Sequence, residues 1–460
     1  MDPSSLISVV RRYLGGGRAP EPGVLRRALA GRLADSRNRR GIRHQLASVV
    51  SVLAAGAACG YQSPLAVAEA AAGWDQELLA AHGCRISPAT GLRVPPSART
   101  LYRVPQGLDA DSFEAALTGA LADAALDPQV TVAAAARRQD ELGKKAGKKR
   151  KRKPPAAESF RQEREEGWFR PHPLHPWLDP AVTGDPGHVP ARHAVAVDGK
   201  ERKGAKAGGK KKVHLLAAVT HTPGIVIAQD KVAKAGKADE ISHFKPLLAP
   251  LPLDGAVVTS DAMQANRDNA LFLRAVKHAH FPWPVLGSQP SLSESLNALP
   301  WQDTPVAAAT SEITRGRVET RTVRVLPAPA GTGFAGAARA LLIERYTTYK
   351  EKGQWRTRAE AVLYLTSLPA GETTPEDLLA HVRGHWRVEH AHWLRDVIWK
   401  EDKSLIRTGN GPQVMSAILN LVISLFRIHG VTSYTAETRR CAQDPRRALQ
   451  YLDLTAPSPG

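Results

Sequence analysis

The chain has 460 residues, 43 % of them hydrophobic, which allows about three domains with a sizeable core and excludes a wholly disordered protein. Its 63 Lys and Arg residues outnumber its 44 Asp and Glu residues, which gives a net charge of +19. This charge points to a polyanionic partner, and nucleic acid is the most common one.

Cysteine usage and the N-terminal sequence indicate the cellular compartment. Three cysteines, Cys59, Cys84 and Cys441, exclude a disulfide framework, and the absence of a CxxC pair excludes a Cys-rich zinc module. The start Met1-Asp2-Pro3 lacks a signal peptide's charged and apolar regions. The apolar stretch 46–59 is shorter than the roughly 20 residues of a bilayer span. We therefore expect a cytoplasmic, nucleoid-associated protein without membrane attachment.

The N-terminal part is predicted to be an all-α domain, residues 1–126. An arginine-rich amphipathic stretch occupies residues 1–34. Glycines and a Pro95-Pro96 pair separate the predicted helices, which cover 44–58, 63–72, 97–104 and 111–125. A DNA-binding helix-turn-helix fits this pattern as well as a small bundle without DNA specificity.

Residues 127–190 are predicted to be a basic, proline-rich linker. Eight of the ten residues in 144–153 are Lys or Arg, and Pro154-Pro155 follows. A solvated tether and a sequence-independent phosphate contact both fit this composition.

Residues 191–288 show the alternation of a mixed sheet covered by helices on both faces. The elements follow the order β-β-β-α-β-α-β, with strands at 194–197, 213–220, 225–232, 256–260 and 284–287 and helices at 239–248 and 266–278. The first and fourth strands are apolar on both faces, as central strands are.

A β-rich insertion and a helical segment complete the predicted α/β architecture. The insertion, 289–373, contains strands at 317–326, 341–349 and 361–367. Residues 374–430 contain a long helix that begins at Thr374, an N-cap followed by Pro375, and an apolar helix at 414–426. Residues 431–460 read as a polar, basic tail.

Two of the apolar strands end in an aspartate, Asp198 and Asp261. Neighbouring strands lie about 4.8 Å apart, so paired strand ends bring their carboxylates together. A divalent cation removes the repulsion between them, and carboxylate oxygens suit Mg²⁺ or Mn²⁺. Each aspartate by itself also fits a turn residue.

A third acid, Glu389, interrupts an apolar stripe in the late helix formed by Leu379, Val382, Trp386, Trp393 and Val397. A carboxylate on a core-facing stripe needs a cation, a donor or a proton. A buried salt bridge to Arg383 or Arg387 therefore competes with a metal-ligand role. Glu401 and Asp402, just beyond the helix, are weaker rivals for that role.

Asp198, Asp261 and Glu389 together predict a two-metal site for phosphoryl transfer, in which two Mg²⁺ or Mn²⁺ ions hold the attacking and leaving oxygens. Basic residues follow Asp198 in a glycine-rich stretch and would place positive charge at the mouth of the site, beginning with Lys200, Arg202 and Lys203.

A zinc site is the competing metal hypothesis. His381, His385 and Glu389 recur at four-residue spacing, and His390 and His392 offer further ligands. The HExxH order of zinc hydrolases is absent, and so is the GxxxxGK[ST] loop of nucleotide-driven motors.

Three segments resemble the DDE transposases of bacterial insertion sequences of the H-repeat-associated type. They are 196–200 (AVDGK), 255–263 (GAVVTSDAM) and 383–390 (RGHWRVEH), and the run 401–407 (EDKSLIR) matches the same family. Residues 40–44 (RGIRH) resemble its N-terminal associated domain. The resemblance covers about residues 35–125 and 190–430.

The resemblance implies an RNase H-like core with Asp198, Asp261 and Glu389 as catalytic metal ligands. It also implies Mg²⁺-dependent cleavage at the element's terminal inverted repeats, strand transfer into target DNA, and a homodimer on paired ends. Further DNA contacts are expected in the matching segments, at Arg383, His385, Trp386, Lys403 and Arg407.

The chain also departs from the family pattern. Relatives often carry Lys-Gly-Asn-Gln after the fifth strand, where this chain has 286–289 (LGSQ). The wider group often has Tyr, Arg and Lys around the glutamate, where Val382, His385 and Asp396 stand here. A DNA-binding relative that has lost catalysis is therefore the alternative hypothesis, although all three acids are retained.

Overall fold

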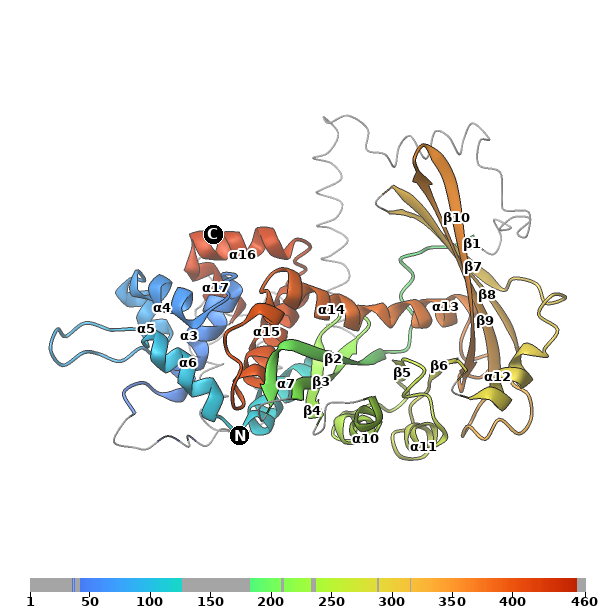
Figure 1. The fold of residues 1–460 in the computed structure, drawn as a ribbon, viewed down its shortest axis with the longest axis horizontal. Helices are drawn as coiled ribbons and strands as arrows, with labels where there is room; N and C mark the ends of the chain where they lie inside the picture. The colour runs from blue at the N-terminus through green and yellow to red at the C-terminus, as the bar shows by residue number, and fades with distance from the viewer. Residues whose placement is uncertain are drawn as a thin grey trace. The chain divides into compact units, whose positions relative to one another are not determined.

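The computed structural model describes residues 35, 37, 42–125, 183–207, 211–232, 237–287, 289–314 and 316–452. The arginine-rich stretch 1–34 and the basic run 144–153 lie outside these residues. The chain divides into two compact units, whose elements are labelled in Figure 1. The first contains residues 1–143, 197–252 and 386–460, and the second contains 144–196 and 253–385.

Five helices form the N-terminal part of the first unit. Ser63, Asp75 and Ser97 cap three of them, each side chain accepting a hydrogen bond from a backbone N–H three residues on. Helix α5 was not expected from the sequence, and the other four lie close to their predicted positions. The helices are α3 (Leu46–Ala58), α4 (Pro64–Ala72), α5 (Gln76–Ala81), α6 (Ala98–Gly107) and α7 (Ala110–Ala125).

C-terminal helices pack onto this N-terminal part. Helix α15 (Gly411–Ile428) contacts α3, α6 and α7. In the described part of the chain it is the helix long and apolar enough to cross a membrane, but 89 % of it is buried, as in a core helix. The described helices α3 to α7 therefore share one compact unit with α15.

The predicted polar tail is wrong for residues 434–451. Helices α16 (Tyr434–Gln443) and α17 (Pro445–Tyr451) occupy this stretch and contact α3. Arg439, Arg440 and Arg446 are exposed, whereas a few apolar residues and Glu437 are buried, so composition alone hides the amphipathic pattern. Cys441 and Leu449 are the buried anchors.

The sheet of the first unit consists of β2 (Ala194–Ala207), β3 (Lys211–Thr220) and β4 (Val226–Val232), in the order β4-β3-β2. Helices α10 (Lys237–Leu248) and α14 (Trp386–Val397) belong to the same unit. Strand β2 begins in the second unit with residues 194–196 and continues into the first.

The second unit is built on a six-stranded sheet in the order β1-β7-β8-β9-β10-β6. Four of its strands lie within residues 289–373, and strands from outside that stretch form both edges. The strands are β1 (Thr183–Gly184), β6 (Pro282–Val285), β7 (Ala308–Thr314), β8 (Arg317–Pro327), β9 (Arg339–Glu351) and β10 (Gln354–Thr366).

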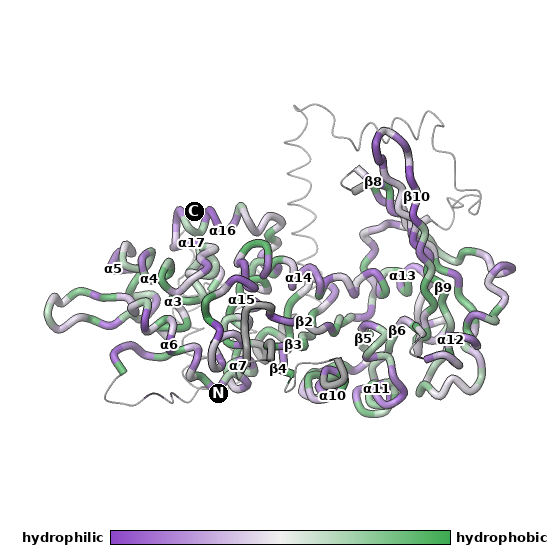
Figure 2. The backbone as a smooth tube through the Cα atoms, in the orientation of Figure 1, coloured by the Kyte–Doolittle hydropathy of each residue, from purple (hydrophilic) through white to green (hydrophobic). Residues whose placement is uncertain are grey.

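The second half of β8, the start of β9 and the end of β10 are buried in a core that includes Val323, Leu341 and Leu378. We call the opposite ends of β9 and β10, on either side of residues 352–353, their outer ends. They are exposed and hydrophilic, as Figure 2 shows. The same unit contains β5 (Val257–Ser260), α11 (Arg267–Leu271), α12 (Pro290–Asn297) and α13 (Pro375–Gly384). A π-helical turn, Phe272–Val276, extends α11.

The long helix predicted from Thr374 is two helices. Thr374 and Asp377 form a capping box at the start of α13, as the sequence indicates. Helix α13 ends at Gly384, and α14 starts at Trp386. Glycine is a poor helix former, which explains a break at this position.

Burial of Glu114 predicts a specific pH dependence of stability. Glu114 on α7 accepts hydrogen bonds from Gln413 Nε2 at 3.1 Å and from Gln229, and desolvation raises its pKa to about 8. A carboxyl whose pKa is raised in the folded state loses stability as pH rises from its ordinary value toward 8. In urea unfolding, Glu114→Gln is expected to exceed the wild type in stability above pH 8. Equal pH dependence of the two proteins would contradict this.

Candidate active site

Asp198 lies inside strand β2, not at its end as predicted, because β2 continues to Ala207. Its side chain is 23 % exposed, and His392 Nδ1 on α14 lies 3.5 Å from Asp198 Oδ2. Alternate residues of a strand share a face, so Asp198 and Lys200 face one side and Gly199 the other. Asp198 is thus a partly buried acid held against α14.

Glu389 lies on α14, in the same unit as Asp198. It precedes His392 by three residues, the spacing of neighbours on one helix face. Its side chain is largely exposed, while partial desolvation raises its pKa. Glu389 therefore lies within one helical turn of His392, the α14 residue that contacts Asp198.

The salt-bridge interpretation of Glu389 is wrong. Within the described residues Glu389 has no hydrogen bond or ion pair, and Arg383 pairs with Glu312 instead. The apolar stripe does not face the core along its whole length. Leu379 is buried on α13, but Trp386, Trp393 and Val397 on α14 are about half exposed, so Glu389 lies on an open face.

Asp261 lies in the second unit, directly after β5, as predicted. Its Oδ1 accepts backbone N–H groups of Met263 at 3.2 Å and Gln264 at 3.3 Å, which is the turn role considered from the sequence. Within this unit β5 pairs with the start of β2, where the Val257 N–H donates to the His193 carbonyl at 2.8 Å. Asp261 thus follows a strand that pairs with the first residues of the Asp198 strand.

The donor chemistry of these acids suits a hard cation, because Asp198, Asp261 and Glu389 offer only carboxylate oxygens. Among the described residues, no group of three or more His, Cys, Asp or Glu side chains is gathered closely enough to hold a metal ion. Asp198 and Glu389 share the framework of one unit, and Asp261 belongs to the other.

The structure does not support the zinc site considered from the sequence. It required His381, His385 and Glu389 on one helix face, but the helix breaks at His385. His381 is buried, and desolvation lowers the pKa of His381 and of His385 to about 4. His385 Nδ1 lies 3.3 Å from Thr259 Oγ1, a contact that engages it within the second unit.

Lys200 and Arg202 do not form the predicted phosphate-binding surface. Lys200 is 8 % exposed and donates to Asp396 Oδ2 at 2.5 Å, and Arg202 is 2 % exposed. The segment is a strand and not a glycine-rich loop, so alternation turns both side chains toward α14 and the residues after it. The side chain of Lys203 lies outside the described residues.

Glu401 is also removed from the list of candidate metal ligands. It is 1 % exposed, and its two oxygens lie 3.8 Å from Arg202 Nε and 3.4 Å from Arg395 Nε. Ser416 Oγ donates to Glu401 at 2.6 Å. Burial by itself would raise the pKa of Glu401, but the two guanidinium groups and this hydroxyl lower it. Glu401 is a structural counter-charge.

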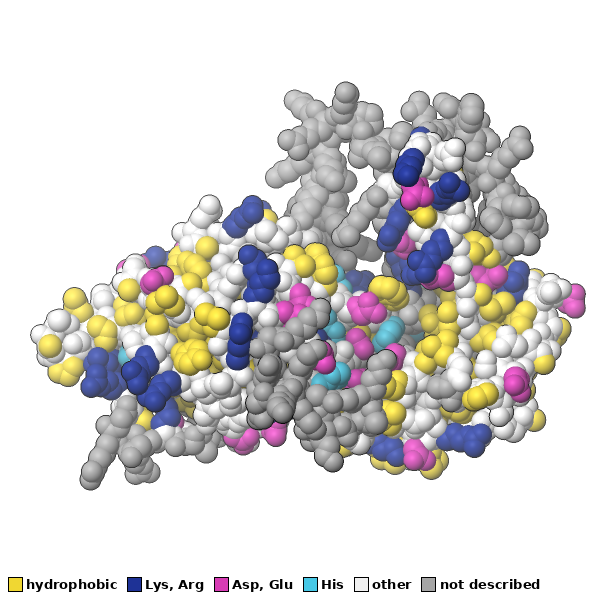
Figure 3. Space-filling model, in the orientation of Figure 1, with side chains coloured by type: hydrophobic (Ala, Val, Ile, Leu, Met, Phe, Trp, Pro, Cys, Tyr) yellow, Lys and Arg dark blue, Asp and Glu magenta, His cyan; other side chains and the backbone are white. Residues whose placement is uncertain are grey.

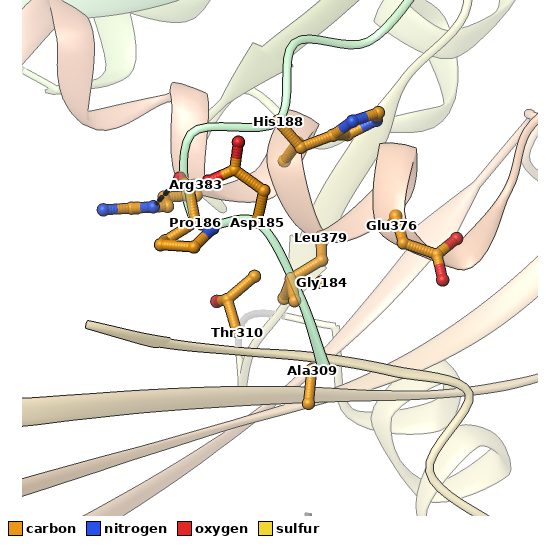
Figure 4. A pocket seen from close by; sticks show the side chains of 10 residues that line it. Gly184, Asp185, Pro186, His188, Ala309, Thr310, Glu376, Leu379 and Arg383 are labelled. Carbon is orange, nitrogen blue, oxygen red and sulfur yellow. Dashed lines mark hydrogen bonds between the residues drawn. The ribbon is translucent and has the colours of Figure 1, made fainter. Parts of the chain in front are cut away.

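The other predicted DNA contacts differ in accessibility. Trp386 is 56 % exposed, and Lys403 and Arg407 lie at the surface of the first unit. In the second unit Arg383 borders a pocket of about 230 Å³ between β1, β7 and α13, and it donates to the Pro186 carbonyl there (Figure 4). Arg383 also pairs with Glu312. None of the three candidate acids lines this pocket.

Sequence reasoning missed one basic surface. Lys350, Lys352, Arg356 and Arg358 are exposed on the outer ends of β9 and β10, where Figure 3 shows dark-blue side chains. Trp355 lies beside them, with Lys350 Nζ 5.3 Å from its ring centroid. Arg356 and Arg358 are two residues apart, and this spacing predicts that both side chains lie on the same face of a strand.

Gly199 is expected to be intolerant of a side chain. A Cβ atom there would lie within 3 Å of His214 Nε2 and of the Glu240 carboxylate, which lie 2.7 Å apart in a partly buried contact. Overpacking costs about 1–3 kcal/mol, so Gly199→Ala should lower the melting temperature. Gly287→Ala, where a Cβ meets nothing within 4 Å, is the matched control. Equal melting temperatures for the two variants would contradict the close packing at Gly199.

Comparison with known proteins supports the resemblance seen in the motifs. Residues 29–119 match the family model described as DDE_Tnp_1-associated, and residues 185–425, more than half of the chain, match the model described as Transposase DDE domain. The second match contains Asp198, Asp261 and Glu389.

Curated relatives come from Escherichia coli. Over 248 residues the chain is 28 % identical to "Putative transposase YncI" of strain O157:H7, covering 51 % of this chain and 61 % of the relative. Over 247 residues it is 25 % identical to "H repeat-associated putative transposase YhhI" of strain K12, covering 51 % and 64 %. The chain thus spans less than two thirds of these relatives' length.

Proposed function

The chain belongs to the family of proteins with a transposase DDE domain, and we propose that it is the transposase of an insertion sequence. In this proposal it cleaves the terminal inverted repeats of the element and joins them to target DNA. Asp198, Asp261 and Glu389 hold two Mg²⁺ or Mn²⁺ ions. The observation that carries the proposal is the link from Asp198 through His392 to the helix of Glu389.

Glu389 and Asp261 are suited to metal binding for different reasons. When bound, the two ions supply Lewis acidity for the attacking and leaving oxygens of an in-line displacement. Glu389 is exposed and unpaired within the described residues, so ligation breaks no existing ion pair. The two backbone N–H groups at Asp261 Oδ1 hold that carboxylate in a fixed orientation.

The fold and partners follow from the same proposal. We assign β2, β3, β4, β5 and α14 to an RNase H-like core. Trp386, Lys403 and Arg407 are the proposed DNA contacts near Glu389, and the basic ends of β9 and β10 are a further one. A homodimer on paired DNA ends completes the proposed assembly.

A nicking assay tests the proposal. The full chain is mixed with a supercoiled plasmid carrying the DNA that flanks its gene, with Mg²⁺, with Mn²⁺ or with EDTA. The expected result is nicked or linear DNA whose breaks map to the inverted repeats, with no product in EDTA. Breaks at random positions, or equal breakage in EDTA, would contradict the proposal.

The alternative function is a DNA-binding protein without catalysis, which the net charge of +19 and the family departure at Asp396 favour. It predicts that the same plasmid is bound with a strong dependence on salt but remains uncut with either metal. The nicking assay therefore decides between the two functions.

A further inference from the structure

Three charged residues on one face of β2 meet a histidine and two acids of α14 and the 3₁₀ turn that follows it. Asp198 Oδ2 lies 3.5 Å from His392 Nδ1, Lys200 Nζ lies 2.5 Å from Asp396 Oδ2, and Arg202 Nε lies 3.8 Å from Glu401 Oε1. We call these three contacts the β2–α14 charge series. All six residues belong to the first unit.

The series follows from matching repeats in the strand and the helix. Two residues along a strand advance about 6.7 Å, and four residues along an α-helix advance about 6 Å. Asp198 and Lys200 are therefore spaced nearly as His392 and Asp396 are. The third contact uses Glu401, in the turn Glu401–Lys403, because α14 ends at Val397.

The order of charges favours the observed register. A shift of α14 by one turn in one direction places Asp396 opposite Asp198, two like charges. A shift in the other direction places Val388 opposite Asp198 and His392 opposite Lys200, so Lys200 loses its carboxylate partner while Asp396 moves opposite Arg202. Lys200 is 8 % exposed, so a register that leaves its ammonium group without a carboxylate partner is costly.

We propose that the Lys200–Asp396 pair is a positioning element that fixes the register of α14 on β2, and with it the placement of Glu389 relative to Asp198. The role rests on the proposed function, because it concerns the same metal site. Glu389 precedes His392 by three residues, so a one-turn displacement of α14 in either direction changes where the Glu389 carboxylate lies relative to Asp198. Lys200 and Asp396 themselves bind neither metal nor DNA in this proposal.

Charge exchange in the full chain tests the pair. Lys200→Glu and Asp396→Lys are each expected to weaken Mn²⁺ binding about 10–100-fold, the usual cost of losing a residue that orients a metal ligand. The double variant, which restores opposite charges, is expected to recover most of that affinity. A merely structural pair would lower the melting temperature without changing Mn²⁺ affinity in the folded protein.

The matched control is the Arg324–Glu344 pair in the second unit, at 2.9 Å and with side chains 19 % and 16 % exposed. Arg324→Glu is expected to lower stability and leave Mn²⁺ affinity unchanged. Folded Lys200→Glu and Asp396→Lys variants that bind Mn²⁺ like the wild type would overturn the proposal.

A second readout reports the register without metal. Asp198→Cys and His392→Cys are combined and treated with a short bifunctional thiol crosslinker; Cys59, Cys84 and Cys441 are buried. Crosslinking is expected to be efficient, to fall several-fold when Lys200→Glu is added, and to recover with Asp396→Lys. If the wild type binds no Mn²⁺, the proposed function fails. This yield then still decides the register, and an unchanged yield overturns it.

Discussion

Asp198→Asn, Asp261→Asn and Glu389→Gln are each expected to lower the rate of metal-dependent nicking by about a thousand-fold. Each change removes a charged oxygen ligand, and losing about 4 kcal/mol of metal-mediated transition-state stabilisation corresponds to that factor. The measurement is the initial rate of plasmid nicking in Mg²⁺ and in Mn²⁺.

DNA binding serves as the control for these variants. Because the acids repel phosphates, the amide variants should bind DNA at least as tightly as the wild type. Glu294→Gln changes an exposed carboxylate on α12 and should nick at the wild-type rate. A variant at 198, 261 or 389 that nicks at the wild-type rate removes that residue from the metal site.

Glu401→Gln is expected to destabilise the protein by about 3–5 kcal/mol, the usual cost of removing one member of a buried ion pair. Glu401 is the shared counter-charge of Arg202 and Arg395, all three 1–2 % exposed. The measurement is urea unfolding at neutral pH. Glu372→Gln, in an exposed pair with Arg192, is the control, with an expected cost of about 0–1 kcal/mol.

The same residue predicts a response to acid. The folded state lowers the pKa of Glu401 below its ordinary value of 4.5, so its contribution is present above that pH and is lost as pH falls below it. The wild type should therefore lose stability below pH 4.5 more steeply than Glu401→Gln. Parallel curves for the two proteins would show that Glu401 is not the counter-charge.

Much of the fold was readable because periodic patterns fix local structure. The helices near residues 46–58 and 110–125 and the strands near 211–220 and 226–232 lie close to their predicted positions. The lengths of individual strands and helices were harder to predict. Strand β2 runs ten residues past its apolar start, through Asp198 to Ala207, because its charged residues pair with partners distant in sequence.

The surroundings of the predicted site residues could not be read from the sequence. Periodicity placed Glu389 on a core-facing stripe, yet Trp386 and Trp393 are about half exposed, because α14 is separate from α13. Lys200 and Arg202 read as a DNA surface because a run of basic residues carries no information about distant acids. Asp396 and Glu401, about 200 residues away, turn both into structural residues.

The central claim is that Asp198, Asp261 and Glu389 bind the same metal ions. It is tested most directly by Fe²⁺-directed hydroxyl-radical cleavage of the full chain bound to DNA, with Fe²⁺ in place of Mg²⁺. Shared metal ligation predicts backbone breaks near residues 198, 261 and 389 together, suppressed by excess Mg²⁺ and absent in Asp198→Asn. Breaks near 198 and 389 without one near 261, or breaks that persist in Asp198→Asn, would contradict it.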